Sequence, residues 1–331
     1  MSELNNNINQ TPDESALPKG FFSRLRKLIN WKQAFTALQY PNYKLWFKGQ
    51  IVSLFGTWLQ MTAQGFLIYE LTHSPAYLGY VGFATGVPSW ILMLYGGVIA
   101  DRLSRRKLLI ITQSAMMVFA FILAALTFLH LVQPWHIILL ALGNGTANAF
   151  DAPARQSFVF ELVKREDLTN AIALNSTMFN SATFIGPAVG GVIYAKFGPE
   201  ICFTLNGLSF LAVIFALARM KLSPFIKKEN KKSPLHELKE GLTYVFRHKT
   251  IRTIMMLIIP NSLLGVSFAT LFPAWAVNVL GGDAITNGYL QSARGLGAMS
   301  GALLIASLGR FHFKGRLLTL GSLLFPVLLF M

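Results

Sequence analysis

Long apolar segments alternate with short polar segments along most of this chain. Eight of them are long enough to cross a bilayer, because about 20 helical residues span roughly 30 Å of hydrocarbon. A ninth segment, residues 316–331, is shorter. The pattern predicts an all-α polytopic membrane protein whose successive spans are antiparallel neighbours. The eight predicted spans are residues 47–70, 76–100, 107–130, 135–158, 168–195, 200–219, 253–279 and 287–308.

Two polar stretches divide the chain. Residues 1–41 form a tail in which Phe21–Phe35 mixes apolar residues with bases, as an amphipathic helix on a membrane surface does. Residues 220–250 carry prolines, lysines and apolar residues at helical spacing, which indicates a linker with a surface helix. The linker separates an N-terminal six-helix bundle, residues 42–219, from a second bundle, residues 251–331, that holds about two and a half spans.

Basic residues occupy every second connection. Of the 29 Lys and Arg residues, 27 lie in the N-terminal tail or on the same side of the membrane as that tail. Positive loops are retained in the cytoplasm, so we expect a cytoplasmic N-terminus. The net charge of +15 would suggest nucleic-acid binding in a soluble protein, but this distribution excludes nucleic acid as a partner. The single cysteine, Cys202, cannot form an internal disulfide and is expected to be a small packing residue.

The most highly charged short connection follows the second span. Its key residues are Gly97, Asp101, Arg102, Arg105 and Arg106. The bases keep the loop cytoplasmic, but topology needs no acid here, so Asp101 indicates a further role. The spacing resembles G-x-x-x-D-R-x-x-R-[RK], the signature loop of the major facilitator superfamily. The resemblance implies that these residues form a charge cluster that latches the two halves on the cytoplasmic side and biases alternating access.

A glycine-rich motif lies in the middle of the predicted span 168–195. A proline there removes one backbone hydrogen bond and kinks the helix, and glycines one turn apart permit close approach of another helix. The motif consists of Gly186, Pro187, Gly190 and Gly191. It resembles the G-P-x-x-G-G motif of antiporter members of the superfamily, and the alternative interpretation is generic helix packing.

Polar residues within the spans recur at helical spacing. Polar groups that face lipid are costly, so each stripe should face the bundle interior or a water-filled cavity. Converging stripes would line a central polar pathway, whereas the alternative is hydrogen bonding between helices without a substrate. The candidate lining residues are Gln60, Gln64, Asn144, Asn148, Asp151, Arg155, Asn180 and Arg294.

The charged members of this set leave alternatives open. Asp151 and Arg155 lie one turn apart and form either an ion pair near the cytoplasmic end or a gate. Arg294 contacts an anionic substrate, pairs with an acid, or extends to the outer membrane surface. The middle of the first span holds no acid, so Glu70 and Asp151 are the titratable candidates for proton coupling. Without a P-loop, a catalytic constellation or a metal-ligating cluster, we expect no enzymatic activity, no cofactor and no metal.

Longer tracts resemble one branch of the superfamily, the transmembrane secretion effectors, which include enterobactin exporters and macrolide-efflux proteins. Among them are residues 56–60, 69–75, 153–157 and 168–176, and the resemblance covers most of residues 42–310. It implies a multi-pass efflux transporter of the bacterial inner membrane that exports a drug-like molecule or siderophore. The implied partners are a small-molecule substrate, protons and the lipid bilayer.

The resemblance departs from the family at the C-terminal end. The family has twelve spans in two six-helix halves, whereas this sequence ends within the segment that corresponds to the ninth. We therefore expect a major facilitator fold with a complete N-terminal bundle and an incomplete second bundle. The alternative to an exporter is a truncated fragment that does not transport.

Overall fold

The computed structural model describes residues 35–222, 234–260 and 267–307, together with short helical pieces at 319–321, 324–325 and 327–328. All regular secondary structure in these residues is helical, as the sequence predicted. The first bundle contains η1 (Thr36–Gln39), α3 (Pro41–Thr72), α4 (Pro75–Arg102), α5 (Arg105–Phe128), α6 (Pro134–Leu162), η2 (Arg165–Asp167), α7 (Leu168–Phe197) and α8 (Pro199–Arg219). It is followed by α9 (Pro234–Arg247), α10 (Lys249–Pro260), η4 (Ser267–Leu271), α11 (Phe272–Asn278) and α12 (Ala284–Ser307).

The boundaries of the long helices follow local sequence signals. Helices α3, α4, α6 and α8 each start with a proline, whose fixed φ suits the first helical turn and whose missing N–H is not needed there. Helix α3 ends where His73 adopts a left-handed conformation with φ of 49°. Gly198, with φ of 87°, separates α7 from α8, a conformation that glycine adopts without a steric penalty. The six predicted spans between residues 47 and 219 are thereby confirmed as helices.

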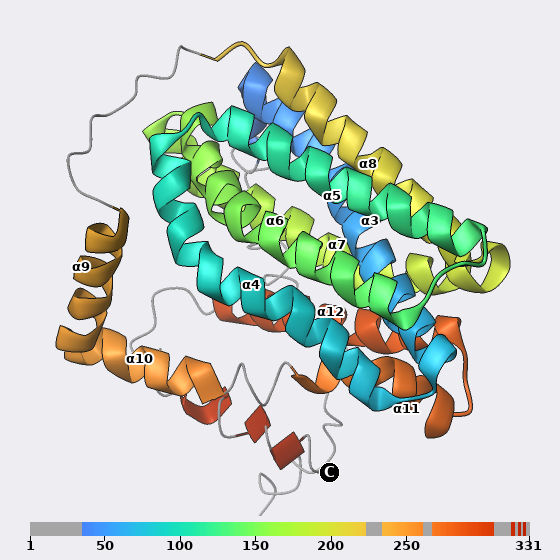
Figure 1. The fold of residues 1–331 in the computed structure, drawn as a ribbon. Coiled ribbons are helices and arrows are strands. Elements are labelled where there is room, and N and C mark those ends of the chain that lie inside the picture. The colour runs from blue at the N-terminus through green and yellow to red at the C-terminus, as the bar shows by residue number, and fades with distance from the viewer. Residues whose placement is uncertain are drawn as a thin grey trace, which may run out of the picture.

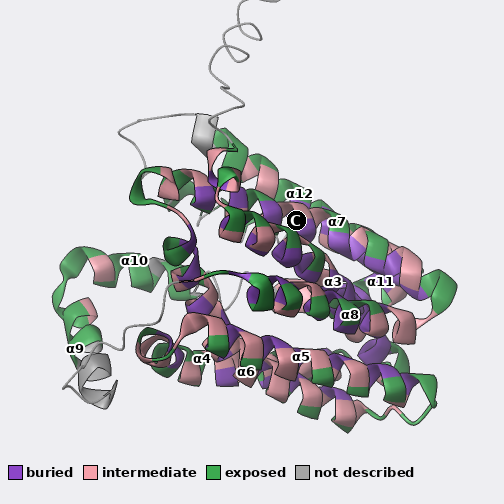
Figure 2. Cartoon of the chain, turned by 90° about the horizontal axis from the view of Figure 1, so that it is seen from above, coloured by how far each residue is buried: buried purple, intermediate pink, exposed green. Residues whose placement is uncertain are grey.

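Helix α3 lies at the centre of the bundle. It packs against α7 and α8, with smaller contacts to α4, α6, α11 and α12. Helix α4 packs on α6, α5 packs on α6 and α8, and α12 packs along α7 (Figure 1). Buried residues turn toward these contacts, whereas exposed residues occupy the outward faces of the helices (Figure 2). The arrangement brings three connections and the N-terminus of α3 to one end of the bundle, which we call the basic end.

Two buried clusters anchor the bundle, one near each end. At the basic end Trp46 packs edge-on against Phe158, with ring centroids 5.4 Å apart. At the opposite end Ile68, Ile137 and the fully buried Cys202 belong to the second cluster. Between helices in lipid, close van der Waals packing replaces the hydrophobic effect as the source of association. The two clusters therefore tie α3 to its neighbours at both ends.

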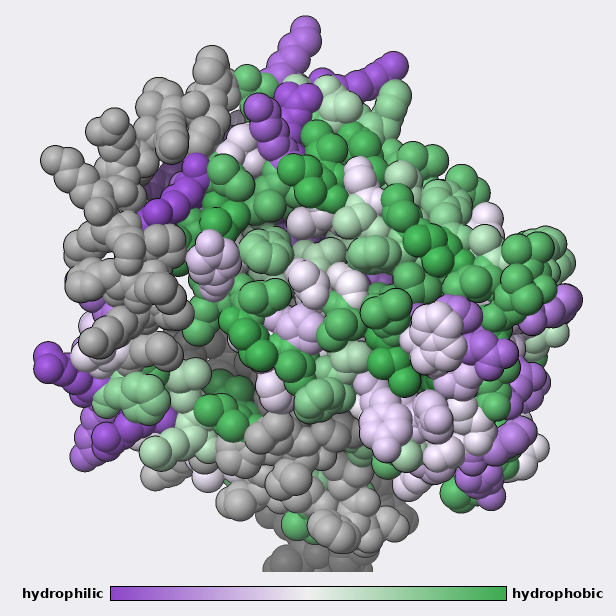
Figure 3. Space-filling model, viewed as in Figure 1, coloured by the Kyte–Doolittle hydropathy of each residue, from purple (hydrophilic) through white to green (hydrophobic). Residues whose placement is uncertain are grey.

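The outer surface is suited to lipid. Helices α3, α4, α5 and α8 are long and apolar enough to cross a membrane by length and composition. Apolar side chains cover much of one face of the molecule, with hydrophilic groups gathered toward its margins (Figure 3). Helices α6 and α7 have 29 and 30 residues and carry polar side chains along their length. Those side chains are the ones the sequence assigned to interior stripes.

The predicted span 253–279 is wrong as a single continuous helix. The structure has α10 ending at Pro260, a 3-10 turn η4, and the separate seven-residue helix α11. Pro273 at the start of α11 lacks an N–H, so a helix continuing from the preceding residues would lose a hydrogen bond there. Helix α9 lies within the predicted linker 220–250, and α12 begins three residues before the predicted span 287–308. The predicted helix at 21–35 and most of the last predicted segment lie outside the described residues.

Candidate functional site

An ionic network joins three helix ends at the basic end of the bundle. The Arg105 guanidinium donates to Asp101 Oδ1 at 3.0 Å and to Glu161 Oε1 at 2.6 Å. Asp101 and Glu161 are the next-to-last residues of α4 and α6, and Arg105 is the first residue of α5. The Arg105 side chain is 23% exposed, whereas that of Asp101 is 67% exposed. Arg105 is thus the central member of the network, and Asp101 is its most exposed member.

Two other members of the signature loop lie nearby. Arg106 donates to the carbonyl oxygen of Ala218 at 2.7 Å, at the C-terminal turn of α8, where a cation also meets the negative end of the helix dipole. Gly97 has free space around it, because a Cβ added there would meet no atom within 4 Å. Arg102 is partly buried at the end of α4. The loop therefore connects α4, α5, α6 and α8 within the first bundle.

The N-terminus of α3 is fixed at this same end. The Tyr40 hydroxyl donates to Asp167 Oδ2 at 2.7 Å, and the Asn42 side-chain amide donates to the Lys221 carbonyl at 2.8 Å. The hydrogen bond to the Asp167 carboxylate, followed by desolvation, raises the pKa of the Tyr40 phenol above its usual value. These contacts place the start of α3 beside the start of α7 and the end of α8.

Asp151 is the centre of a second, fully buried polar cluster. Its side chain is 0% exposed and accepts hydrogen bonds from Thr112 Oγ1 at 2.9 Å and Gln113 Nε2 at 2.8 Å, both on α5. Arg155, one turn along α6, donates through Nε at 3.0 Å and also through Nη2. The structure thus places the predicted pair in direct contact as an ion pair. The ion pair lies within α6, and the hydrogen bonds from Thr112 and Gln113 join it to α5.

The glycine motif of α7 lies at the contact of three helices. A Cβ on Gly186 would lie 2.6 Å from Trp58 Cβ, and one on Gly190 would lie 3.2 Å from the Leu59 backbone, both on α3. A Cβ on Gly191 would instead overlap the carbonyl oxygen of Ala284, at the start of α12. The first face of the motif therefore packs on α3 and the second on α12.

Helix α12 also contributes glycines to this contact. A Cβ on Gly288 would lie 2.5 Å from the Pro187 carbonyl oxygen, and one on Gly295 would lie 2.6 Å from the Thr183 carbonyl oxygen. Each of these contacts is with backbone, which cannot move aside as a flexible side chain does. Helices α7 and α12 are therefore in close backbone contact over about two turns.

At the opposite end, neutral hydrogen bonds join α3 to α11 and α12. The Tyr69 hydroxyl donates to Asn278 Oδ1 at 2.7 Å. Thr62 Oγ1 lies 3.5 Å from Gln291 Oε1, and Gln291 in turn donates to Asn287 Oδ1 at 3.3 Å. The Tyr194 hydroxyl donates to Glu70, linking α7 to the last turn of α3. This end of the described bundle is closed by contacts between uncharged groups and one carboxylate.

The predicted polar stripes do not all face the same space. Gln60 accepts a hydrogen bond from Asn206 Nδ2 on α8 at 2.7 Å, so it lies in a contact within the first bundle. The other uncharged members of the set are partly buried, and their side chains form no hydrogen bond to another described residue. They are Gln64, Asn144, Asn148 and Asn180. Their role in lining a pathway stays a prediction.

Several contact residues were missed from the sequence. Glu161, Thr112 and Gln113 lie 38 to 56 positions from their partners, and only the packing of α6 on α4 and α5 brings them together. The available signal for Glu161 was an acid at the end of a span on the same side as Arg105. Thr62 and Tyr69 were missed because the predicted polar stripe lies on a different face of α3. Their seven-residue spacing, two helical turns, was the signal for a face toward α11 and α12.

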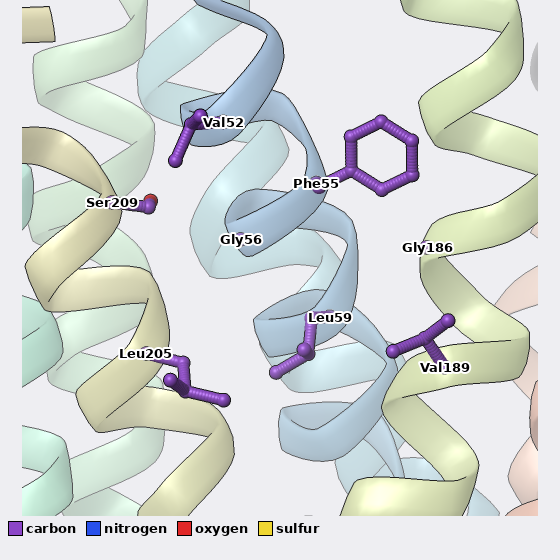
Figure 4. A pocket seen from close by; sticks show the side chains of 8 residues that line it. All are labelled: Val52, Phe55, Gly56, Leu59, Gly186, Val189, Leu205 and Ser209. Atoms are coloured by element: carbon purple, nitrogen blue, oxygen red, sulfur yellow. The ribbon is translucent and has the colours of Figure 1, made fainter. Parts of the chain in front are cut away.

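The described pocket is an apolar groove with a volume of about 170 Å³. It lies between α3, α7 and α8 (Figure 4). Ser209 contributes a hydroxyl, but that hydroxyl donates to the Asn206 carbonyl at 2.7 Å. Val52, Val189 and Leu205 on its rim are 40–49% exposed. The groove therefore suits hydrocarbon, and it offers a polar molecule little to bind.

A bundle of long helices with an apolar outer surface, an ionic network at one end and hydrogen bonds across α3 and α12 at the other defines a polytopic membrane transporter of the major facilitator type. The sequence profile of the transmembrane secretion effectors matches residues 32–331, and the chain belongs to that family. The family was predicted from the signature loop and the longer tracts, and the prediction is confirmed. Efflux transporters for siderophores and drugs are among its members.

The chain is similar to two relatives of known name and to one solved structure. It is 26% identical over 86% of its length to a staphyloferrin A transporter of Staphylococcus aureus, of which it covers 72%. It is 28% identical over 86% of its length to an enterobactin exporter of Shigella boydii, of which it covers 68%. A bacterial homologue of the lysosomal transporter Spinster, in an inward-facing, unoccupied conformation, matches with a TM-score of 0.63 and 15% identity. That match covers 84% of this chain and 64% of the solved chain, and it confirms the fold.

Proposed function

We propose that this chain belongs to a secondary-active exporter that uses the proton gradient to move a siderophore or drug-like molecule out of the cell by alternating access. The basic end faces the cytoplasm of a bacterium, and the N-terminus lies on that side. The observation that carries the proposal is the difference between the two ends of the bundle. The ion pairs of Asp101, Arg105 and Glu161 at the basic end join helices of the first bundle, whereas hydrogen bonds at the opposite end join α3 to α11 and α12.

This arrangement supports an inward-open state. Tyr69–Asn278 and Thr62–Gln291 hold the outer side closed, and both pairs must separate when the outer side opens. Neutral hydrogen bonds suit this role because each contributes only about 0.5–1.5 kcal/mol, so the closed state is favoured without being locked. The Asp101–Arg105–Glu161 network keeps the cytoplasmic ends of α4, α5 and α6 together during that change.

Breaking the network at Glu161 should impair transport without unfolding the protein. The substitution Glu161→Gln removes the 2.6 Å ion pair with Arg105, and partly exposed pairs of this kind contribute at most about 1 kcal/mol to stability. The network holds the ends of α4, α5 and α6 as one unit, so its loss lets these ends move separately while the bundle changes state. We expect an export rate reduced several-fold, measured in cells, at an unchanged melting temperature.

The matched control is Glu166→Gln, an exposed acid on η2 at the same end of the molecule. It removes the same charge outside the network and should leave export unchanged. A charge exchange, Arg105→Glu with Glu161→Arg, should recover part of the lost rate. Equal export by Glu161→Gln and the wild type would contradict the role of the network.

The proposed function is tested by export against a proton gradient. Purified protein in proteoliposomes should move staphyloferrin A or enterobactin only when a pH gradient is imposed, and a protonophore should stop it. Glu70 and Asp151 remain the candidates for the coupling group, and Glu70→Gln is the milder substitution because its hydrogen bond from Tyr194 can be kept by an amide oxygen. Movement that is independent of the pH gradient, or no movement of any exported compound, would refute the proposal.

A further inference from the structure

Arg294 lies deep in the membrane-spanning part of α12. The helix starts at Ala284, so ten residues, or about 15 Å of helix axis, separate Arg294 from its outer end. That distance is about half of a hydrocarbon layer roughly 30 Å thick. Another 13 residues follow before the helix ends at Ser307. An arginine near the middle of a span is too deep for its side chain to reach the membrane surface easily.

The arginine shares a face with two other polar residues. Asn287, Gln291 and Arg294 are spaced four and three residues apart, which places them on one side of the helix. Gln291 contacts Thr62 on α3, so this side faces the first bundle. Two other faces are accounted for by their contacts. Gly288 and Gly295 pack on α7, while Tyr289, Leu296 and Leu303 are exposed.

This polar face lacks acceptors for its donors. Arg294 is partly buried and forms no ion pair or hydrogen bond with any described residue. The Asn287 side chain is 0% exposed, and its Nδ2 has no hydrogen-bond partner in the described part of the chain. A charged group without a counterion in a span is costly, and such residues usually mark the path of a substrate or ion. A negatively charged ligand would supply the acceptor that the Arg294 guanidinium lacks.

From this arrangement we propose that Arg294 binds the anionic group of the exported molecule, so that the exporter is selective for carboxylate-bearing substrates. The proposal rests on the proposed function and adds the charge class of its substrate. A guanidinium is suited to the task because it offers a planar pair of N–H donors that matches a carboxylate. The excess of basic residues at the basic end would also raise the local concentration of anions there.

The experiment compares three compounds in proteoliposomes with an imposed pH gradient. They are staphyloferrin A, whose carboxyl groups are ionised at pH 7, its methyl ester, and erythromycin, whose amine is cationic. The variants are Arg294→Gln, Arg294→Lys and, as a matched loss of positive charge, Arg165→Gln on the exposed turn η2. Size-exclusion profiles and melting temperatures of all variants verify that they are folded.

We expect the wild type to export staphyloferrin A about tenfold faster than the ester or erythromycin. Only the carboxylate of staphyloferrin A can accept a charge-assisted hydrogen bond from Arg294. Arg294→Gln should lose that export at least about tenfold, Arg294→Lys should lie between, and Arg165→Gln should match the wild type. Should Arg294→Gln fail to fold, the comparison of acid and ester on the wild type still decides.

Two results would overturn the inference while leaving the proposed function intact. One is equal export of the ester or of erythromycin by the wild type. The other is full export of staphyloferrin A by folded Arg294→Gln, which would indicate that Arg294 pairs with an acid of the protein. If none of the three compounds is moved by the wild type, the proposed function fails, and the inference fails with it.

Discussion

Replacing Asp151 with alanine should lower the free energy of unfolding by about 3–5 kcal/mol, the largest loss expected from any single substitution described. The carboxylate is fully buried and satisfies donors on Thr112, Gln113 and Arg155. Removing it leaves the Arg155 cation and the Gln113 amide without this acceptor, whereas the Thr112 hydroxyl can still donate to the Leu108 or Leu109 carbonyl oxygen. The measurement is denaturation in mixed detergent micelles, followed by the loss of helical signal.

The matched control is Thr112→Val, which removes one neutral donor and keeps the ion pair. It should cost no more than about 1.5 kcal/mol. Asp151→Asn, which keeps the shape and the acceptor oxygen, should lie between the two. If Asp151→Ala and Thr112→Val destabilise the protein equally, the ion pair contributes nothing and the cluster is held by packing alone.

The second large effect is expected at Gly295. In Gly295→Ala the new Cβ would lie 2.6 Å from the Thr183 carbonyl oxygen and 2.9 Å from the Phe184 backbone. Both contacts are with the main chain of α7, so the helices must separate by some tenths of an ångström. Overpacking of this kind costs about 1–3 kcal/mol, which corresponds to roughly five- to 150-fold in the population of the state that needs this contact. Export should fall accordingly.

Gly297→Ala is the control for this prediction, two residues further along the same helix. No atom lies within 4 Å of a Cβ built there. Alanine also favours a helix over glycine by about 1 kcal/mol, so this variant should be as stable as the wild type or more so. Export by Gly295→Ala at the rate of Gly297→Ala would show that α7 and α12 do not need this close contact during transport.

The number and placement of the first six spans could be predicted from the sequence because each span has its own local signals. A long apolar run and a basic loop on alternate sides are both readable without tertiary information. The prediction of the seventh span as one helix was wrong because it relied on the same local signals. Pro260 and Pro273 both lie within or beside a continuous apolar run, and hydropathy alone did not show that the helix is interrupted between them.

The partners of the candidate residues could be predicted less well. The motif around Gly186 predicted close helix packing, but α12 as the partner of Gly191 depends on how the chain returns about 90 residues later. Gln60 belongs to a polar stripe that also fits a pathway, and only the position of α8 shows that it bonds to Asn206. Helical periodicity states which residues share a face, whereas the identity of the opposing helix depends on the whole fold.

The burial of Cys202 has a practical consequence for measuring conformational change by site-directed labelling. Its thiol is fully enclosed, close to the Gly190 carbonyl, so maleimide probes and nitroxides have no access to it in the folded protein. A cysteine introduced on the surface would then be the sole labelled position, with no need for a cysteine-free background. Spin labels on exposed residues beside Tyr69 and Asn278, such as Leu71 and Leu280, would report their separation directly. Membrane-impermeant reagents would assign the same two sites to a side of the bilayer.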